Sequence, residues 1–432
     1  MDYSKIMKSL HFNTILVLPI LLFISTPAIE VFICTFNVVQ RIAPFESYSY
    51  LVLKIVQPLG YTVLIGRIFY LFFHESLLKT INALLKSTTA KLFLGVVLLI
   101  IISTIVNGLS TASLFGDWYR NEPISLVISY FLVFYLFVSQ IHNYKLKKLV
   151  LLVSMGISII VACYAVWVRL YYGEKFITLI SPYLIGVFFQ HNHYGYYLAI
   201  HIMLSSGLYA LAERKSEKVF AAICLIINTA ILSFNNTFGA WLACFCSFIF
   251  QIIVIYFVKH KFDKASFQSF AIFLFITFLM SFWTDNIFSS IMQFFVDVDS
   301  IAKDPQHADS AGTTRWMLWK FTIKKIAEKP LFGFGNEGIK TMLEEATGST
   351  RPHNEFLQYT VFYGIPAGLL YIFGCLSVFI HDYKYRMLLD NETIICLIAS
   401  FCYLVSSCFG NTMFYTTPFF FILLGLSLTA TD

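Results

Sequence analysis

The stretch RPHNEFLQYTVFYGIPAG, residues 351–368, places ionisable side chains directly before an apolar run. His353 titrates near neutral pH and can take a proton from a hydroxyl group. Arg351 can bind phosphate oxygens through charge-assisted hydrogen bonds. Glu355 can orient the histidine or serve as a carboxylate at the start of a helix. The pattern therefore indicates a catalytic or anion-binding site, with a helix-capping or interfacial His353 as the alternative.

A helix that starts after His353 presents its N-terminus to this site, and helix N-termini attract anions. Asn354 is a supporting polar group at that start. Upstream, Arg315 opens the run RWMLWKFTIKKIAEK and offers a second charge-assisted contact to phosphate. We expect Arg315, Arg351 and the helix start to bind an anion together.

Residues 313–329 are predicted to form a basic amphipathic helix that Thr313 or Thr314 caps and Pro330 ends. Its apolar residues recur at helical spacing: Trp316, Trp319, Ile323 and Ile326. A basic helix with tryptophans suits a membrane interface. Either its cations are solvated while the helix packs on the protein, or some of them face an anionic lipid headgroup.

The segment FFQHNHYGYYLAI contains two histidines, His191 and His193, that do not share a helix face. We therefore expect Asn192 and His193 to cap a helix and line a polar cavity, and we expect no metal site. The glycines of LFGFGNEG, residues 331–338, fit a dinucleotide-binding spacing, but no strand precedes them. We expect them to form a tight turn against the protein, and we expect no cofactor.

The composition places these residues in a membrane. The chain has 432 residues, 58% hydrophobic and 12% charged, and apolar runs of about 18 residues or more recur along it. We predict an all-α polytopic membrane protein, residues 1–432 forming one integral membrane domain with about twelve transmembrane helices. The predicted spans are 13–37, 50–73, 91–110, 123–141, 149–171, 193–212, 219–234, 240–259, 267–283, 354–381, 393–409 and 416–430.

The distribution of basic residues among the loops predicts on which side of the membrane each loop lies. Lysine and arginine gather in alternate short loops, which predicts that both termini are cytoplasmic. The one large loop, residues 284–353, then lies on the outer face, and its length indicates a function. Arg67 lies within the second predicted span and either reaches the cytoplasmic interface or faces a deep polar cavity.

The order of these features resembles the O-antigen ligase and polymerase family of bacterial envelopes. The family's ligases share a pattern that this chain follows from His353-Asn354 through nine residues to Gly364. The chain departs from the pattern at its last position, where it has Ala367. The upstream segment 313–335 also resembles the family's arginine-aromatic helix with its Pro and Gly-x-Gly turn.

The resemblance implies a GT-C-type membrane glycosyltransferase that inverts the anomeric centre without a metal. Its donor is a glycan on undecaprenyl diphosphate, and its acceptor is a glycan or a lipid-core sugar. Arg315 and His353 match the family's diphosphate-binding arginine and its histidine, which assists the acceptor hydroxyl or stabilises the leaving phosphate. Where a second arginine often stands, this chain has Phe238. We expect Arg351 or Lys54 to replace it, and Arg67 only in a deep cavity.

From this resemblance we expect a bacterial inner-membrane enzyme with its active site on the outer, periplasmic face. Its partners are membrane lipids and lipid-linked glycans, with no nucleic acid. A polymerase of O-antigen, capsular or exopolysaccharide repeat units is favoured, because the residue at Phe238 departs from the ligase pattern. The alternatives are an O-antigen ligase that transfers the glycan to lipid A-core and, less favoured, a lipid-linked sugar transporter. The motif leaves the sugar and its linkage open.

Overall fold

The computed structural model describes residues 3–35, 86–116, 122–132, 138–172, 183–188, 190–260, 262–284, 286–414 and 416–428. The second predicted span, residues 50–73, contains both Lys54 and Arg67 and lies outside these ranges. Within them every regular element is a helix, as predicted. The α-helices are α1 (Tyr3–Thr35), α5 (Thr88–Val106), α6 (Thr111–Phe115), α7 (Ile124–Ser129), α8 (Tyr144–Tyr172), α10 (His191–Leu211), α11 (Lys215–Asn235), α12 (Phe238–Lys259), α13 (Lys264–Ser281), α14 (Asn286–Lys303), α15 (Arg315–Glu328), α16 (Gly335–Gly338), α17 (Lys340–Thr347), α18 (Glu355–Tyr363), α19 (Ile365–Lys384), α20 (Asn391–Ser407) and α21 (Thr417–Ser427). Two short 3-10 helices are η3 (Val138–Gln140) and η4 (Arg386–Leu388).

Six of the described helices are long and apolar enough to cross a membrane, so the chain is an integral membrane protein. They are α5, α8, α11, α12, α13 and α19. Shorter apolar helices include α20 and α21. The structure thus accounts for part of the predicted set, and the number twelve stays a prediction.

The predicted span 354–381 is wrong as one continuous helix, because it divides into α18 and α19 at Gly364. Gly364 has φ 93°, a conformation that strongly favours glycine. A Cβ atom built there lies 2.1 Å from the carbonyl oxygen of Leu331. The chain must turn at this glycine because another backbone segment lies against it.

That segment is the glycine turn between α15 and α16. Gly333 has φ 61°, and a Cβ atom there lies 2.5 Å from the carbonyl oxygen of Phe362. The amide of Ile365 donates to the carbonyl of Pro330 over 2.8 Å. The predicted tight turn against the bundle is confirmed, and it links the two motifs that resemble the ligase family.

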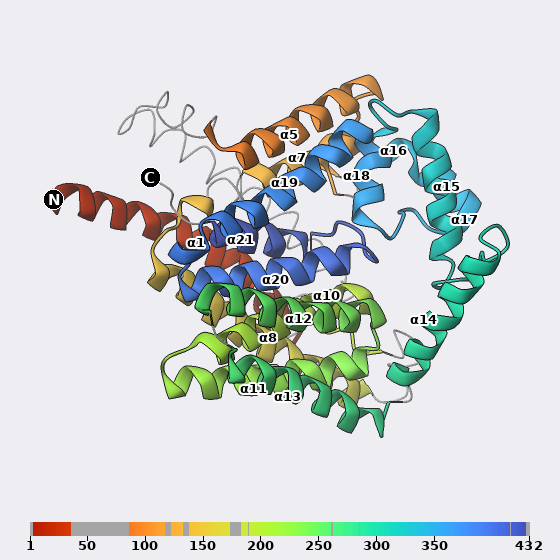
Figure 1. Cartoon of the computed structure of the whole chain (residues 1–432). Coiled ribbons are helices and arrows are strands. Elements are labelled where there is room, and N and C mark those ends of the chain that lie inside the picture. Colours follow the sequence, from red (N-terminus) through yellow and green to blue (C-terminus); the bar gives the residue numbers. More distant parts are fainter. Residues whose placement is uncertain are drawn as a thin grey trace.

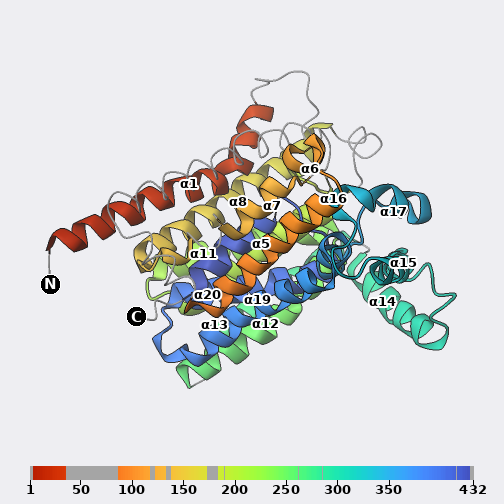
Figure 2. The same ribbon diagram turned by 90° about the horizontal axis from the view of Figure 1, so that it is seen from above.

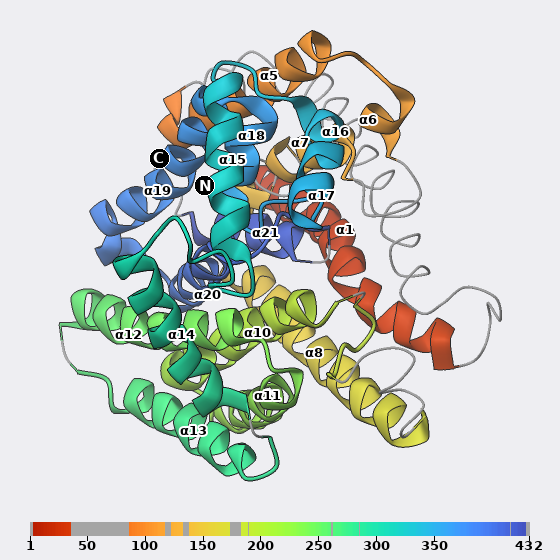
Figure 3. The same cartoon turned by 90° about the vertical axis from the view of Figure 1, so that its right-hand side faces the viewer.

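Helices α14 to α17 lie at one end of the helical bundle (Figure 1). From above, α14, α15 and α17 extend beyond the ends of α5, α12 and α19 (Figure 2). An end-on view shows α14, α15 and α17 in front of the bundle (Figure 3). The residues predicted to form one long loop are therefore largely helical, and they form a layer over one end of the bundle.

A cluster of charged side chains joins the starts of α8, α11 and α20. Lys147 is 2% exposed and lies 3.5 Å from Asp390. Lys148 contacts Glu217 over 3.1 Å and Glu392 over 3.5 Å. Lysines counted as cytoplasmic in the sequence thus come together in space, and the side of the membrane on which they lie stays a prediction.

Candidate functional site

A polar cavity of about 640 Å³ lies where the layer of α14 to α17 meets the bundle. Its wall brings together Arg315, His353 and Asn192, three of the predicted site residues. The remaining lining residues are Gln190, Thr313, Thr314, Leu318, Lys340, Glu344, Thr347, Gly348, Ser349 and Thr350. Three separate stretches of the chain therefore supply one hollow: the start of α10, the start of α15, and the stretch from α17 to His353.

Arg315 is the first residue of α15, inside the predicted helix 313–329. Thr314 is the residue before the helix, but its side chain makes no capping hydrogen bond. The Arg315 Nη1 group donates to the carbonyl of Gly312 over 3.3 Å and to Thr313 Oγ1 over 3.2 Å. Its buried Nε has no hydrogen-bond partner among the described residues. The guanidinium is thus held on one side and has donor capacity left for an anion.

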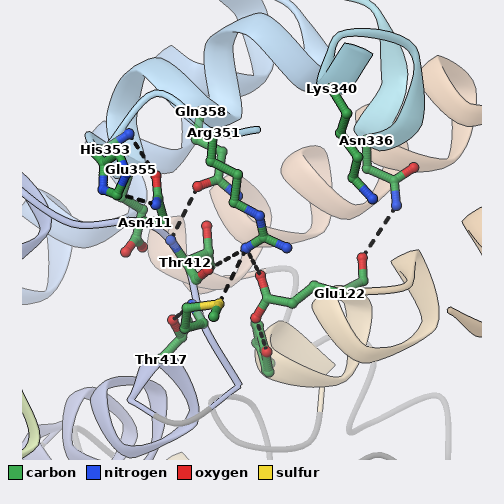
Figure 4. A network of polar contacts seen from close by, with 12 residues as sticks. Glu122, Asn336, Lys340, Arg351, His353, Glu355, Gln358, Asn411, Thr412 and Thr417 are labelled. Atoms are coloured by element: carbon green, nitrogen blue, oxygen red, sulfur yellow. Dashed lines mark hydrogen bonds and ion pairs between the residues drawn. The ribbon is translucent and has the colours of Figure 1, made fainter. Parts of the chain in front are cut away.

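Asn411, on the loop between α20 and α21, contacts both the backbone and the ring of His353. The His353 backbone amide donates to Asn411 Oδ1 over 2.7 Å. Its ring Nδ1 lies 3.3 Å from Asn411 Nδ2 (Figure 4). The residue has φ 50°, which is costly for a non-glycine side chain. Asn411 therefore fixes both the strained backbone and the ring of His353.

The indole of Trp319 connects α15 to the segment that carries His353. Its Nε1 donates to the carbonyl of Pro352 over 3.0 Å. Trp319 lies four positions after Arg315, on the same face of the helix. This bond sets the spacing between the arginine and the histidine.

Asn354 and Glu355 begin α18, as expected, but neither lines the cavity. The Asn354 side chain accepts from the amide of Leu357 over 3.0 Å and so caps the helix. Glu355 is fully buried and accepts hydrogen bonds from Tyr371 and, over 2.6 Å, from Tyr403. Its position fits the helix-start carboxylate rather than an orienting partner of the histidine.

Arg351 also lies away from the large cavity. Its guanidinium is buried, 3.5 Å from the Glu122 carboxylate, and it donates to the carbonyl of Thr412 over 2.8 Å (Figure 4). A buried arginine with a carboxylate and a carbonyl on it is already neutralised and hydrogen-bonded. A direct phosphate contact by Arg351 stays a prediction, and its observed contacts tie the His353 segment to the bundle.

Lys340, which the sequence reasoning missed, brings a second cation to the cavity. It begins α17 and lines both the large cavity and a small neighbouring hollow beside Arg351. Its Nζ lies 2.7 Å from Glu337. Glu344, one turn further along α17, adds a carboxylate to the same wall. The only sequence signal for Lys340 is that it lies in the long loop.

The start of α10 forms the opposite side of the cavity. Asn192 lines it, as predicted, but Gln190 occupies the N-cap position of the helix, and its side chain makes no capping hydrogen bond. His193 is buried and does not line the cavity, so the predicted pair separates. Burial, aided by the Arg315 cation, lowers the pKa of His191 to about 4.

The position that often holds arginine in the family is Phe238, and it contributes nothing to the cavity wall. Its ring lies 5.6 Å from that of Phe294 on α14. In the part of the chain that the structure describes, no three His, Cys, Asp or Glu side chains gather as a metal site. Metal independence stays a prediction.

Residues 220–372 match the protein-family model described as O-antigen ligase. The match runs from α11 into α19 and includes Arg315, Lys340 and His353. Asn411 lies beyond it. A comparison with curated proteins finds no match.

Proposed function

We propose that the chain is an inverting membrane glycosyltransferase of the O-antigen ligase and polymerase family, because residues 220–372 match the O-antigen ligase family model. Its donor is a glycan on undecaprenyl diphosphate, and its fold is of the GT-C type. It acts in the bacterial inner membrane, with both termini cytoplasmic and the cavity on the periplasmic face. The observation that carries the proposal is that Arg315 and His353 line one cavity.

The chemistry needs little beyond what this cavity contains. A lipid diphosphate is a good leaving group, so an enzyme mainly has to position the reactants and stabilise the departing charge. Arg315 binds the diphosphate, and Lys340 takes the place of the second arginine that is lacking at Phe238. His353 acts at the reacting groups, and Asn192 and Glu344 are placed to bind sugar hydroxyls.

We propose that the acceptor is a second repeat unit, which makes the enzyme a polymerase of O-antigen, capsular or exopolysaccharide units. The phenylalanine at position 238 is the observation that favours this activity over ligation. The description of the matching family model favours the alternative, an O-antigen ligase that transfers the glycan to lipid A-core.

A product assay separates these activities. Purified protein is reconstituted with a synthetic undecaprenyl-diphosphate repeat unit, with or without lipid A-core. Growth of the lipid-linked glycan supports the polymerase, and transfer to the core sugar supports the ligase. Movement of the donor between leaflets without a new glycosidic bond would identify a transporter and contradict both.

A further inference from the structure

The contacts of Asn411 reveal which nitrogen of His353 carries the proton. Asn411 lies between α20 and α21 and is 9% exposed. Its amide meets two different groups of the same residue, the backbone N–H and the ring Nδ1 of His353. The first contact needs an acceptor atom on Asn411 and the second uses its donor group, so together they determine the protonation of the His353 ring.

The backbone contact sets the orientation of the amide. A backbone N–H can only donate, so the Asn411 atom 2.7 Å from it must be the oxygen Oδ1. The NH2 group of the amide then faces the ring. The usual ambiguity between amide oxygen and nitrogen is removed by the chain itself.

The ring contact follows from that orientation. The Asn411 NH2 group can only donate, so Nδ1 of His353, 3.3 Å away, must accept. A neutral imidazole with an accepting Nδ1 carries its proton on Nε2. An imidazolium would turn an N–H toward the NH2 group, so this contact disfavours the charged ring.

The charged groups around the cavity come from α15, α16 and α17. Arg315 on α15 and Lys340 on α17 are cations on the same wall. The carboxylates beside them are Glu344 on α17 and Glu337, which lies 2.7 Å from Lys340 Nζ. His191 and Tyr196 on α10 are titratable groups that also feel the Arg315 charge. Among the described residues around the cavity, cations and carboxylates are therefore equal in number, and the proton position on His353 follows from the Asn411 contacts.

We propose that Asn411 is a positioning residue that holds His353 as a neutral Nε2–H hydrogen-bond donor to the departing diphosphate oxygen. This inference rests on the proposed function, and of the two roles that the resemblance leaves open for His353 it selects stabilisation of the leaving phosphate, through the contacts of Asn411. The acceptor oxygen forms the new bond to the anomeric carbon. The bond from that carbon to the phosphate oxygen breaks, and its electron pair stays on the oxygen that Nε2–H stabilises. The hydroxyl proton leaves to water.

The variant Asn411→Asp tests the proton position through the pH profile of transfer. A carboxylate accepts from both the backbone N–H and Nδ1–H, so it moves the proton of the neutral ring to Nδ1 and removes the Nε2 donor. We expect wild-type transfer to be nearly constant from pH 6 to 9. Asn411→Asp should lose about a hundredfold at pH 8 and recover as the pH falls, because the imidazolium again carries Nε2–H. A variant as active as wild type at pH 8 would overturn the proposal, since the same carboxylate strengthens a general base.

A second variant keeps the test independent of the fold of the 411 loop. His353→Gln places an amide NH2 near the Nε2 position and can donate, but it cannot act as a base. We expect it to keep about a tenth of wild-type transfer or more, while His353→Ala loses about a hundredfold or more. Equal inactivity of the two variants would overturn the donor role.

The same assays distinguish failure of the proposed glycosyltransferase function from failure of the proposed donor role of His353. Wild-type protein that transfers no glycan, or His353→Ala with full activity, contradicts the proposed function and this inference with it. If the wild type is active while His353→Ala and His353→Gln are equally inactive, only the donor role of His353 is contradicted.

Discussion

At the scale of single residues, backbone strain gathers at the cavity. Thr313, Thr314 and His353 all have positive φ and all line it. Such conformations cost on the order of 1–3 kcal/mol each and persist where the surrounding contacts impose them. Two of them precede Arg315, and the third carries the candidate catalytic ring, so the strain lies in the backbone that aims both side chains.

Arg315→Ala should weaken binding of an undecaprenyl-diphosphate donor. Loss of a hydrogen bond to a charged group costs about 1.5–3 kcal/mol, which corresponds to about a tenfold to hundredfold rise in Kd. Kd is measured by microscale thermophoresis in detergent. Lys324→Ala, on an exposed position of the same helix, is the control and should bind like wild type. An unchanged Kd for Arg315→Ala would remove its phosphate role.

Lys340→Ala tests the second cation. We expect a rise in donor Kd of about tenfold, because the cavity then keeps one of its two lining cations. Lys325→Ala is a matched control, since that lysine pairs with Glu328 away from the cavity. Equal donor affinity for Lys340→Ala and wild type would return the question of the second cation to Arg351 or to residues outside the described ranges.

The site residues that could be predicted from the sequence are those with a local pattern. Arg315 opens an amphipathic helix, and His353 precedes an apolar run, so both stand out by spacing alone. Asn411 could not be predicted, because its partner lies 58 positions away and only the fold brings the two together. Arg351 was predicted to bind phosphate because its carboxylate partner, Glu122, is remote in sequence and only the fold brings the two together.

At the scale of elements, the break between α18 and α19 positions the site. It lets α18 run separately from α19, with the N-terminus of α18 next to His353. Hydropathy predicted one helix here because the apolar run is continuous, although Gly364 and Pro366 were both visible. Proline is favoured in the first turn of a helix, so the pair marks a new start rather than a kink. The tertiary contact with Leu331, absent from the local pattern, decides the outcome.

Gly364→Ala should therefore destabilise the protein. The added methyl group strains a φ of 93° and meets the Leu331 carbonyl, at a cost of at least about 1–3 kcal/mol. The apparent unfolding temperature in detergent, followed by tryptophan fluorescence, should fall. Gly156→Ala in α8 is the control, because no atom lies within 4 Å of its new Cβ, and it should leave that temperature unchanged or raise it. A Gly364→Ala protein as stable as wild type would refute the role of this contact.

At the scale of the whole molecule, the two ends of the bundle differ in kind. One end contains the lysine–carboxylate pairs at the starts of α8, α11 and α20. The end that contains the cavity is covered by the layer of α14 to α17. The helical fold class could be predicted from composition, because only continuous apolar runs were needed. The layer could not, since its helices pack through contacts such as that of Trp319 with Pro352.

Cysteine labelling in intact cells tests the predicted orientation. A membrane-impermeant maleimide should label Gln306→Cys, on the exposed turn after α14, and should not label Ser216→Cys at the start of α11. The unsubstituted protein measures background from its own cysteines. Labelling of Ser216→Cys with protection of Gln306→Cys would place the cavity on the cytoplasmic side.

The central claim is that a cavity containing Arg315 and His353 transfers a glycan from a lipid diphosphate, and the most direct measurement is single-turnover transfer by purified His353→Ala protein. We expect a rate about a hundredfold or more below wild type at saturating donor, with an unchanged unfolding temperature. His307→Ala, which alters an exposed histidine paired with Asp304, should transfer at the wild-type rate. Transfer by folded His353→Ala at the wild-type rate would contradict the account.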